Sequence, residues 1–177
     1  MGKKLIIKGA DFSANGIPTR TTELIYDSIT GFTDLNGWAS ENYPAISTPT
    51  NANITGRNIT SIVLKRYSNW QATKPIAIAK YNTQSGTYTV LITIPVATFN
   101  ANTYTEVSLG AGVRIGSKEL LMVGPTDLSS GGVGTCFSMA KGNESTNYGK
   151  YSLSKTGSFS GPSYGNALMC KIYAEVE

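Results

Sequence analysis

Aromatic side chains in two loop-like stretches have the clearest potential for binding chemistry. Trp38 lies in Asn36-Gly37-Trp38-Ala39-Ser40 with Tyr43 just after it, and Trp70 lies in Tyr67-Ser68-Asn69-Trp70-Gln71. A flat ring among amide and hydroxyl groups suits a sugar, because aromatic side chains give a large contact area at a small entropic cost. We therefore predict that Trp38, Tyr43 and Trp70 bind glycan. The competing interpretation is that each tryptophan packs in the core or at its rim.

Acidic side chains raise the alternative of glycoside hydrolysis. Asp27, Asp34 and Glu41 lie in the same part of the sequence as Trp38. A glycoside hydrolase needs one carboxyl group to donate a proton while a second attacks the sugar or activates water. The local sequence does not show that any two of them face one cleft, and solvated loop acids are the commoner arrangement. We therefore expect no enzymatic activity, and these three acids are the first candidates if hydrolysis is found.

Other catalytic and metal-binding signatures are missing from the sequence. It contains no histidine, which excludes Ser-His-Asp and Cys-His nucleophiles and imidazole-based zinc sites. The glycines of Gly131-Gly132-Val133-Gly134 lack the lysine and the following helix of a phosphate-binding loop. No acidic residues have the spacing of a calcium-binding loop. We predict no cofactor and no metal.

Two cysteines and a group of tyrosines each have more than one interpretation. Cys136 and Cys170 lie in strand-like segments rather than in a CxxC motif or a Cys/His cluster. We expect buried free thiols in preference to a disulfide or a metal site. Tyr148, Tyr151 and Tyr164 form a second candidate surface, which fits either a ligand or a neighbouring subunit.

Composition favours a single β-rich domain. The chain has 177 residues, of which 15% are charged, and this length can bury a core without metals or disulfides. Its net charge of +4 is spread thinly, whereas a nucleic-acid binder more often has a dense basic patch. No signal peptide precedes the first strand, and no apolar run reaches the roughly eighteen residues that span a bilayer. We expect a protein made in the host cytoplasm, with no nucleic-acid partner and no membrane insertion.

Hydrophobic alternation with a period of two predicts strands along most of the chain. The clearest pair is 76–81 and 88–94, which the link Asn82–Gly86 joins into a hairpin. The last segment alternates from Ala167 to Glu177, so we expect it to be a strand. Further strands are predicted at 58–67, 104–109, 112–115, 120–123 and 135–139.

These strands predict an all-β fold, an antiparallel β-sandwich of the jelly-roll type. The stretch 59–124 is similar in pattern to the core of phage-fibre and carbohydrate-binding jelly rolls. Two other stretches, 30–53 and 141–166, are rich in Gly, Ser and Asn but lack sustained alternation. We predict that they are long loops with a functional or interface role.

The opening segment, residues 1–17, combines a lysine-flanked strand with a turn-rich exit. Lys3-Lys4-Leu5-Ile6-Ile7-Lys8 runs directly into Gly9-Ala10-Asp11-Phe12-Ser13-Ala14-Asn15-Gly16-Ile17. This segment resembles the start of small phage and prophage virion-surface proteins of the fibre and receptor-binding kind. The resemblance implies an assembly role for Lys4, Leu5, Ile6, Ile7 and Phe12. Alternatively, the lysines protect an edge strand against unwanted pairing.

Together these features predict a structural protein on the surface of a phage-type virion: a head fibre, a tail fibre or a decoration subunit. We divide the chain into an assembly segment, 1–17, and a jelly-roll domain, 18–177. The resemblance further implies a homo-oligomer, with a trimer favoured, contacts with other virion proteins, and binding to host-surface glycan. The alternative is a stand-alone carbohydrate-binding or adhesin module.

Overall fold

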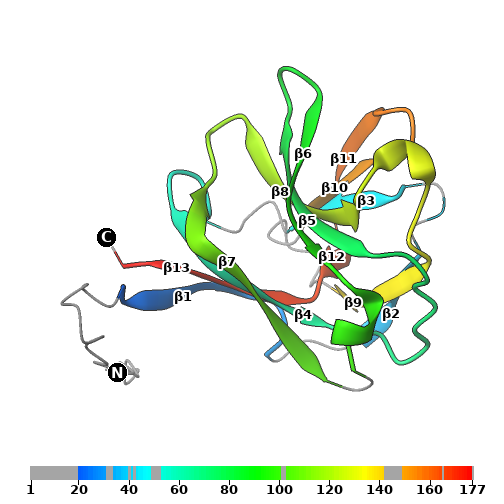
Figure 1. Cartoon of the computed structure of the whole chain (residues 1–177), viewed down its shortest axis with the longest axis horizontal. Helices are drawn as coiled ribbons and strands as arrows, with labels where there is room; N and C mark the ends of the chain where they lie inside the picture. The colour runs from blue at the N-terminus through cyan, green and yellow to red at the C-terminus, as the bar shows by residue number, and fades with distance from the viewer. Residues whose placement is uncertain are drawn as a thin grey trace.

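The computed structural model is built from strands and short 3-10 helices (Figure 1). It describes residues 20–30, 34–39, 41, 43–48, 53–100, 103–141, 149–164 and 166–176. The strands form antiparallel sheets of four, six and three strands, so the prediction of an all-β sandwich is confirmed. Within the described ranges, no helix is long and apolar enough to cross a membrane. The opening segment 1–17 lies outside these ranges.

The first sheet has the strand order β1-β13-β4-β7. Its members are β1 (Thr22–Asp27), β13 (Cys170–Glu175), β4 (Asn58–Lys65) and β7 (Tyr104–Arg114). β1 and β7 are its two opposite edges, and β13 lies between β1 and β4 (Figure 1). The first and last strands in chain order therefore lie side by side.

The second sheet has the strand order β11-β10-β3-β8-β5-β6. Its members are β11 (Phe159–Tyr164), β10 (Gly149–Leu153), β3 (Ala45–Ser47), β8 (Glu119–Pro125), β5 (Ile76–Asn82) and β6 (Thr87–Ile94). The third sheet, in the order β12-β9-β2, consists of β12 (Asn166–Leu168), β9 (Thr135–Lys141) and β2 (Asp34–Ala39). The 3-10 helices η1 (Val96–Thr98) and η2 (Leu128–Ser130) lie in connections between strands.

One apolar core fills the space between the sheets. The four-stranded sheet contributes buried side chains that include Ile59, Ile62, Leu64 and Ile172. The six-stranded and three-stranded sheets contribute others, among them Ile46, Ile76, Ile78, Leu121, Val123, Trp38, Phe137 and Met139. Because residues from facing sheets share this cluster, the inner faces pack against each other as in a β-sandwich. We call this cluster the main core.

The outer face of the six-stranded sheet is covered as well. Ala45, Ala79, Tyr81, Met122 and Leu153 form a second buried cluster. Alternate residues of a strand point to opposite faces, so β5 and β8 supply side chains to both clusters. Burial on both faces explains why these two strands contain uninterrupted apolar runs instead of a polar alternation.

The predicted hairpin is confirmed as β5 and β6, which pair from Ile76 with Ile94 to Asn82 with Thr87. The Asn82 side-chain oxygen accepts hydrogen bonds from two backbone amides of the turn, both at 2.9 Å. A register shift makes a bulge at Leu91, which is where the prediction differs from the structure. Strict alternation puts Leu91 and Ile92 on opposite faces, whereas both pack against the main core.

The predicted C-terminal strand is confirmed, but it is broken at Met169 into β12 and β13. Met169 is buried and bonds to two other elements: its amide donates to the Ser138 carbonyl at 2.9 Å, and its carbonyl accepts from the Lys65 amide at 3.3 Å. At this residue the chain leaves the three-stranded sheet and enters the four-stranded sheet.

The prediction of long loops at 30–53 and 141–166 is wrong in part. The first stretch contains β2 and β3, and the second contains β10 and β11. β3 is buried at all of its residues, so no alternation marks it in the sequence. The predicted strands 104–109 and 112–115 belong largely to a single strand, β7, which bends at Gly110 and Gly112, where φ is 62° and 87°.

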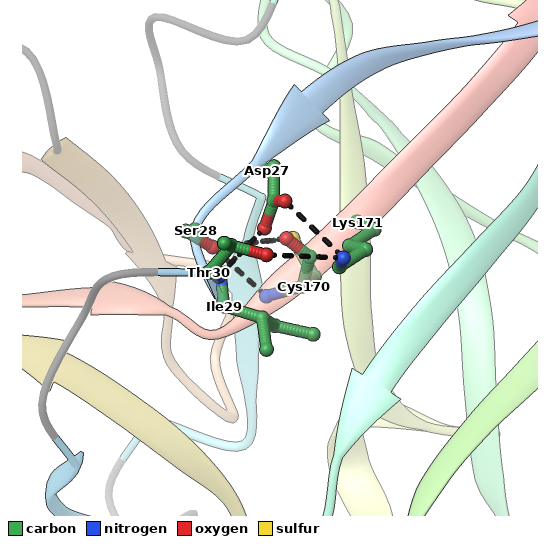
Figure 2. A network of polar contacts seen from close by, with 6 residues as sticks. All are labelled: Asp27, Ser28, Ile29, Thr30, Cys170 and Lys171. Carbon is green, nitrogen blue, oxygen red and sulfur yellow. Dashed lines mark hydrogen bonds and ion pairs between the residues drawn. The ribbon is translucent and has the colours of Figure 1, made fainter. Parts of the chain in front are cut away.

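A buried serine fastens the end of β1 to the start of β13 (Figure 2). The Ser28 hydroxyl donates to the Leu168 carbonyl at 2.8 Å and accepts from the Cys170 amide at 2.9 Å. The Ser28 amide also donates to the Cys170 carbonyl at 2.9 Å. These bonds satisfy backbone groups that the interruption between β12 and β13 would otherwise leave unpaired.

Asp27, the last residue of β1, makes further polar contacts next to Ser28 (Figure 2). Asp27 accepts hydrogen bonds from the Ile29 and Thr30 amides, both at 2.9 Å, and pairs with the Lys171 ammonium at 3.2 Å. Partial burial alone would raise the pKa of Asp27, but the hydrogen bonds from Thr30, Ile29 and Lys171 outweigh it and lower the pKa. The ionised form of Asp27 therefore stabilises the fold.

We predict that Asp27→Asn lowers the free energy of unfolding by about 1–2 kcal/mol at pH 7. The contribution of a carboxylate with a lowered folded-state pKa is present above the unfolded pKa of about 3.9 and is lost as the pH falls through the folded value. Urea unfolding at pH 7 and at pH 3 should therefore show a smaller difference between wild type and variant in acid. Glu41→Gln, at an exposed acid, is the control and should leave stability unchanged. An equal loss at both pH values would contradict the assigned role of the charge.

Candidate functional site

Trp70 lies in the connection between β4 and β5 and packs at the rim of the main core. Its ring centroid is 5.5 Å from those of both Phe99 and Phe137. The guanidinium carbon of Arg66 lies 4.9 Å from the Trp70 ring centroid, and Arg66 also donates to the Phe99 carbonyl at 2.6 Å. Aromatic packing and a cation–π contact therefore hold the Trp70 ring in place through protein contacts alone.

The connection that holds Trp70 is itself attached to β9 and the residues before it. The Tyr67 amide donates to the Cys136 carbonyl at 3.0 Å, and the Gln71 amide donates to the Thr135 carbonyl at 2.8 Å. Gly134 permits this close approach, because a Cβ there would lie 2.5 Å from the Gln71 carbonyl oxygen and the backbone has a φ of 98°. The position of Trp70 is thus part of the packing of the sandwich.

The structure does not place the three predicted glycan-binding residues on one exposed surface, because Trp38 is buried. Trp38 is only 5% exposed and belongs to the main core, whereas Tyr43 is 46% exposed. Among the described residues, no ring contact joins Trp38, Tyr43 and Trp70 to one another. A buried indole has no face to offer a sugar, so we assign Trp38 to the core. The predicted assembly residues lie outside the described ranges: Lys4, Leu5, Ile6, Ile7 and Phe12.

The acids considered for hydrolysis come from different segments of the chain. Asp27 is held by backbone amides and Lys171, as described above. Glu41 is exposed, and Asp34 begins β2. In the part of the chain that the structure describes, no cluster of three or more His, Cys, Asp or Glu side chains is arranged to hold a metal ion.

A row of stacked aromatic rings lies on the outer face of the six-stranded sheet. The ring centroid of Phe159 is 5.4 Å from that of Tyr81 and 4.7 Å from that of Tyr151, with interplanar angles of 27° and 19°. Tyr81 is 4% exposed and Phe159 is 38% exposed, while Tyr151 is half-buried. The row therefore extends from a buried base to rings that contact solvent. We call Tyr81, Tyr151 and Phe159 the outer aromatic row.

The three rings of this row meet because β10 and β11, which pair as a two-stranded ribbon, curl over the outer face of their own sheet. We call this pair the β10–β11 ribbon. In the strand order, β11 is four positions away from β5, which in a flat sheet would be about 19 Å. Stacking of Phe159 on Tyr81 requires the ribbon to fold back across the outer face. A register shift between Lys150 and Ser152 and a φ of 125° at Gly161 accompany this bend.

Hydroxyl groups adjoin the outer aromatic row at the turn of the same ribbon. The side-chain oxygens of Ser154 and Thr156 are 3.0 Å apart, those of Thr156 and Ser158 are 3.3 Å apart, and the Ser158 amide donates to the Ser154 hydroxyl at 2.9 Å. Thr156 and Ser158 are exposed, and Ser158 immediately precedes Phe159. An aromatic ring beside hydroxyl groups can stack on the apolar face of a sugar while its neighbours exchange hydrogen bonds with the sugar hydroxyls.

The sequence prediction contains only part of this surface. Tyr151 belongs to the predicted second tyrosine surface, whose member Tyr148 lies outside the described residues. Phe159 and Tyr81 are missed, since they are distant in sequence and meet only through the curl of the ribbon. The sequence feature that could have indicated this surface is Phe159 itself, a large apolar residue in an otherwise polar, glycine-rich stretch.

The two cysteines are free and buried, as predicted. Burial raises the pKa of both thiols, that of Cys170 to about 12. A thiol that stays protonated and inaccessible is a poor nucleophile. Neither cysteine therefore contributes a reactive group to the surface.

The fold and the outer aromatic row define this chain as an all-β sandwich with an exposed aromatic surface. No family model, curated protein or solved structure matches it.

We predict that Trp38→Ala lowers the free energy of unfolding by about 3–5 kcal/mol, since it removes a large buried side chain. Tyr43→Ala, at an exposed position, should change stability by less than about 0.5 kcal/mol. Guanidinium unfolding of both variants measures the difference. A small loss in Trp38→Ala would contradict the assignment of this tryptophan to the core.

Proposed function

We propose that this chain is a structural subunit on the surface of a phage-type virion, in a head fibre, a tail fibre or a decoration protein, and that it binds host-surface glycan through the outer aromatic row. The observation that carries the glycan role is the 38% exposure of Phe159 within a stack of rings. The resemblance of residues 1–17 to virion-surface proteins supports the virion assignment. The proposal includes no enzymatic activity and no cofactor.

We further propose that the sandwich is a jelly roll. Apart from the three-stranded sheet and the β10–β11 ribbon, four strands belong to each large sheet, in the orders β1-β13-β4-β7 and β3-β8-β5-β6. Along the chain, β1, β4, β7 and β13 lie in one sheet, and β3, β5, β6 and β8 lie in the other. This distribution is the one expected of two Greek keys folded together. Jelly rolls occur in viral capsid and lectin domains, which supports both parts of the proposal.

Self-assembly, with a trimer favoured, is the third part of the proposal. Closed cyclic assembly covers sheet edges that a monomer must protect by other means. Among the described residues, β1, β6 and β7 are edge strands without a further neighbour. The segment 1–17 is the proposed assembly element, and other virion proteins are its further partners.

The glycan role predicts that Phe159→Ala and Tyr151→Ala each weaken binding to a host-surface polysaccharide roughly two- to twelvefold, because an aromatic contact contributes about 0.5–1.5 kcal/mol. Calorimetric titration against a panel of purified bacterial surface polysaccharides measures this. Tyr104→Ala is the matched control, since Tyr104 is a 55% exposed aromatic residue on β7 of the other sheet. Unchanged binding in Phe159→Ala, or an equal loss in Tyr104→Ala, would rule out the outer aromatic row as the binding site.

A stand-alone carbohydrate-binding or adhesin module is the second candidate, because the exposed aromatic row would serve it equally well. The two candidates differ in assembly. A free module needs no other copy, whereas a fibre or decoration subunit has to associate with its neighbours.

Removal of residues 1–16 should convert a trimer into a monomer if the opening segment drives assembly. Light scattering coupled to size exclusion, on the full chain and on a chain that begins at Ile17, measures the mass of each. If the shortened chain unfolds at the same denaturant concentration as the full chain, its sandwich is intact. A monomer in both cases would contradict self-assembly and favour the stand-alone module.

A further inference from the structure

Two exposed lysines lie on either side of one short connection next to the β10–β11 ribbon. Lys74, in the connection between β4 and β5, donates from its ammonium to the Ser130 carbonyl at 2.6 Å. Lys155 lies in the turn between β10 and β11, and its ammonium is 3.3 Å from the point where a Cβ on Gly131 would be. Ser130 and Gly131 are neighbours in the chain, so both ammonium groups adjoin the same peptide unit. We call Lys74 and Lys155 the lysine pair.

The lysine pair carries positive charge that no carboxylate neutralises directly. Among the ion pairs between described residues, none includes either lysine. The nearest acid in sequence to Ser130 is Asp127, whose carboxylate accepts hydrogen bonds from the Ser129 amide at 3.0 Å and the Ser129 hydroxyl at 2.8 Å. Two cations and one acid leave this region with a net positive charge. A lysine ammonium has three donors, so even Lys74 keeps donors for an anion.

The turn that contains Lys155 places it near the exposed ring of Phe159. Two backbone hydrogen bonds, at 2.9 and 3.0 Å, close the turn 154–158. Leu153, two residues before Lys155, pairs with Phe159. At about 3.3 Å per residue, Lys155 is therefore at most about 7 Å along the ribbon from this pair. Adjoining sugar units of one glycan can span such a distance.

The connection beside the lysine pair belongs to the same outer face. Leu128 of η2 packs against the second buried cluster, which contains Tyr81 of the outer aromatic row. Three kinds of group therefore follow one another on this surface: the ammonium groups, the hydroxyls of Thr156 and Ser158, and the ring of Phe159. A sugar with an anionic substituent offers a partner to each of them, since its ring face is apolar and its hydroxyls exchange hydrogen bonds.

We propose that the glycan bound by the outer aromatic row is anionic, and that Lys155 and Lys74 bind its carboxylate or phosphate group while a neighbouring sugar ring stacks on Phe159. This inference rests on the proposed glycan role and adds the chemical class of the glycan. Carboxylates and phosphates accept charge-assisted hydrogen bonds from ammonium groups, and these are stronger than hydrogen bonds between neutral groups. The lysine pair thus selects the anionic group, and the aromatic row supplies the stacking surface.

A panel of purified bacterial surface polysaccharides tests the class of glycan. The panel contains neutral polysaccharides, polysaccharides with uronic acid and polysaccharides with phosphate substituents. Calorimetric titration of the full chain should show binding to anionic members only, and the group that binds distinguishes a carboxylate from a phosphate. Reduction of the uronic acid carboxyl groups to alcohols, or removal of the phosphate substituents, should weaken binding of the same polysaccharide. Higher ionic strength should weaken it as well, because salt screens exposed charges.

Substitutions in the lysine pair test its role. Lys155→Gln and Lys74→Gln should each weaken binding to an anionic polysaccharide roughly 1.5- to fivefold, the range of an exposed ion pair. Lys155→Arg keeps the charge and should retain the affinity. In the double Gln variant, the preference for the anionic polysaccharide over its neutralised form should be lost. Arg114→Gln is the control for net charge, since it removes an exposed cation on β7 of the other sheet, and it should leave binding unchanged.

The possible outcomes separate the class of glycan from the glycan role itself. Equal affinity for neutral and anionic polysaccharides would overturn the anionic class and leave the glycan role intact. The same holds if Phe159→Ala weakens binding while the double Gln variant does not. An equal loss in Arg114→Gln would show that net charge alone attracts the polysaccharide, which overturns the lysine pair as its site. Absence of binding to every member of the panel would overturn both proposals.

Discussion

Burial of one aliphatic core between the sheets is the interaction on which the rest of this structure depends. The described residues contain no disulfide, so apolar burial, at about 25 cal/mol per Å², is the main source of folding free energy. Side chains such as Ile59, Ile62 and Ile78 are fully buried and come from both large sheets. Since the inner faces are committed to this core, any surface for recognition has to be built on the outer faces or at the sheet edges.

Strands of the sandwich could be predicted where burial of one face makes apolar and polar residues alternate in the sequence. A turn signal next to the alternating segment made the prediction firmer. The hairpin at 76–94 and the strand at 170–175 are examples. β3 could not be recognised, because it is buried throughout and only three residues long. The bulge at Leu91 could not be foreseen either, since a bulge depends on the pairing of β6 with β5.

The candidate site was harder to predict than the fold, because residue type does not determine exposure. Trp38 and Tyr43 are both aromatic residues in polar surroundings, yet one is 5% exposed and the other 46%. The difference arises from β9, whose pairing with β2 places Trp38 over the main core. Similarly, Phe159 and Tyr81 become neighbours only when the β10–β11 ribbon curls over the sheet.

The interior position of β13 has a consequence for how this protein is made. β1 pairs with β13, and the bond from Ser28 to Leu168 joins residues 140 positions apart. A chain that emerges from the ribosome N-terminus first cannot complete the four-stranded sheet until residues 170–175 have been synthesised. Until then, the pairing edges of β1 and β4 are open, and contacts of such long sequence separation form slowly. Unpaired strand edges of this kind favour aggregation, so the last strand to be synthesised is also the one that covers the two open edges.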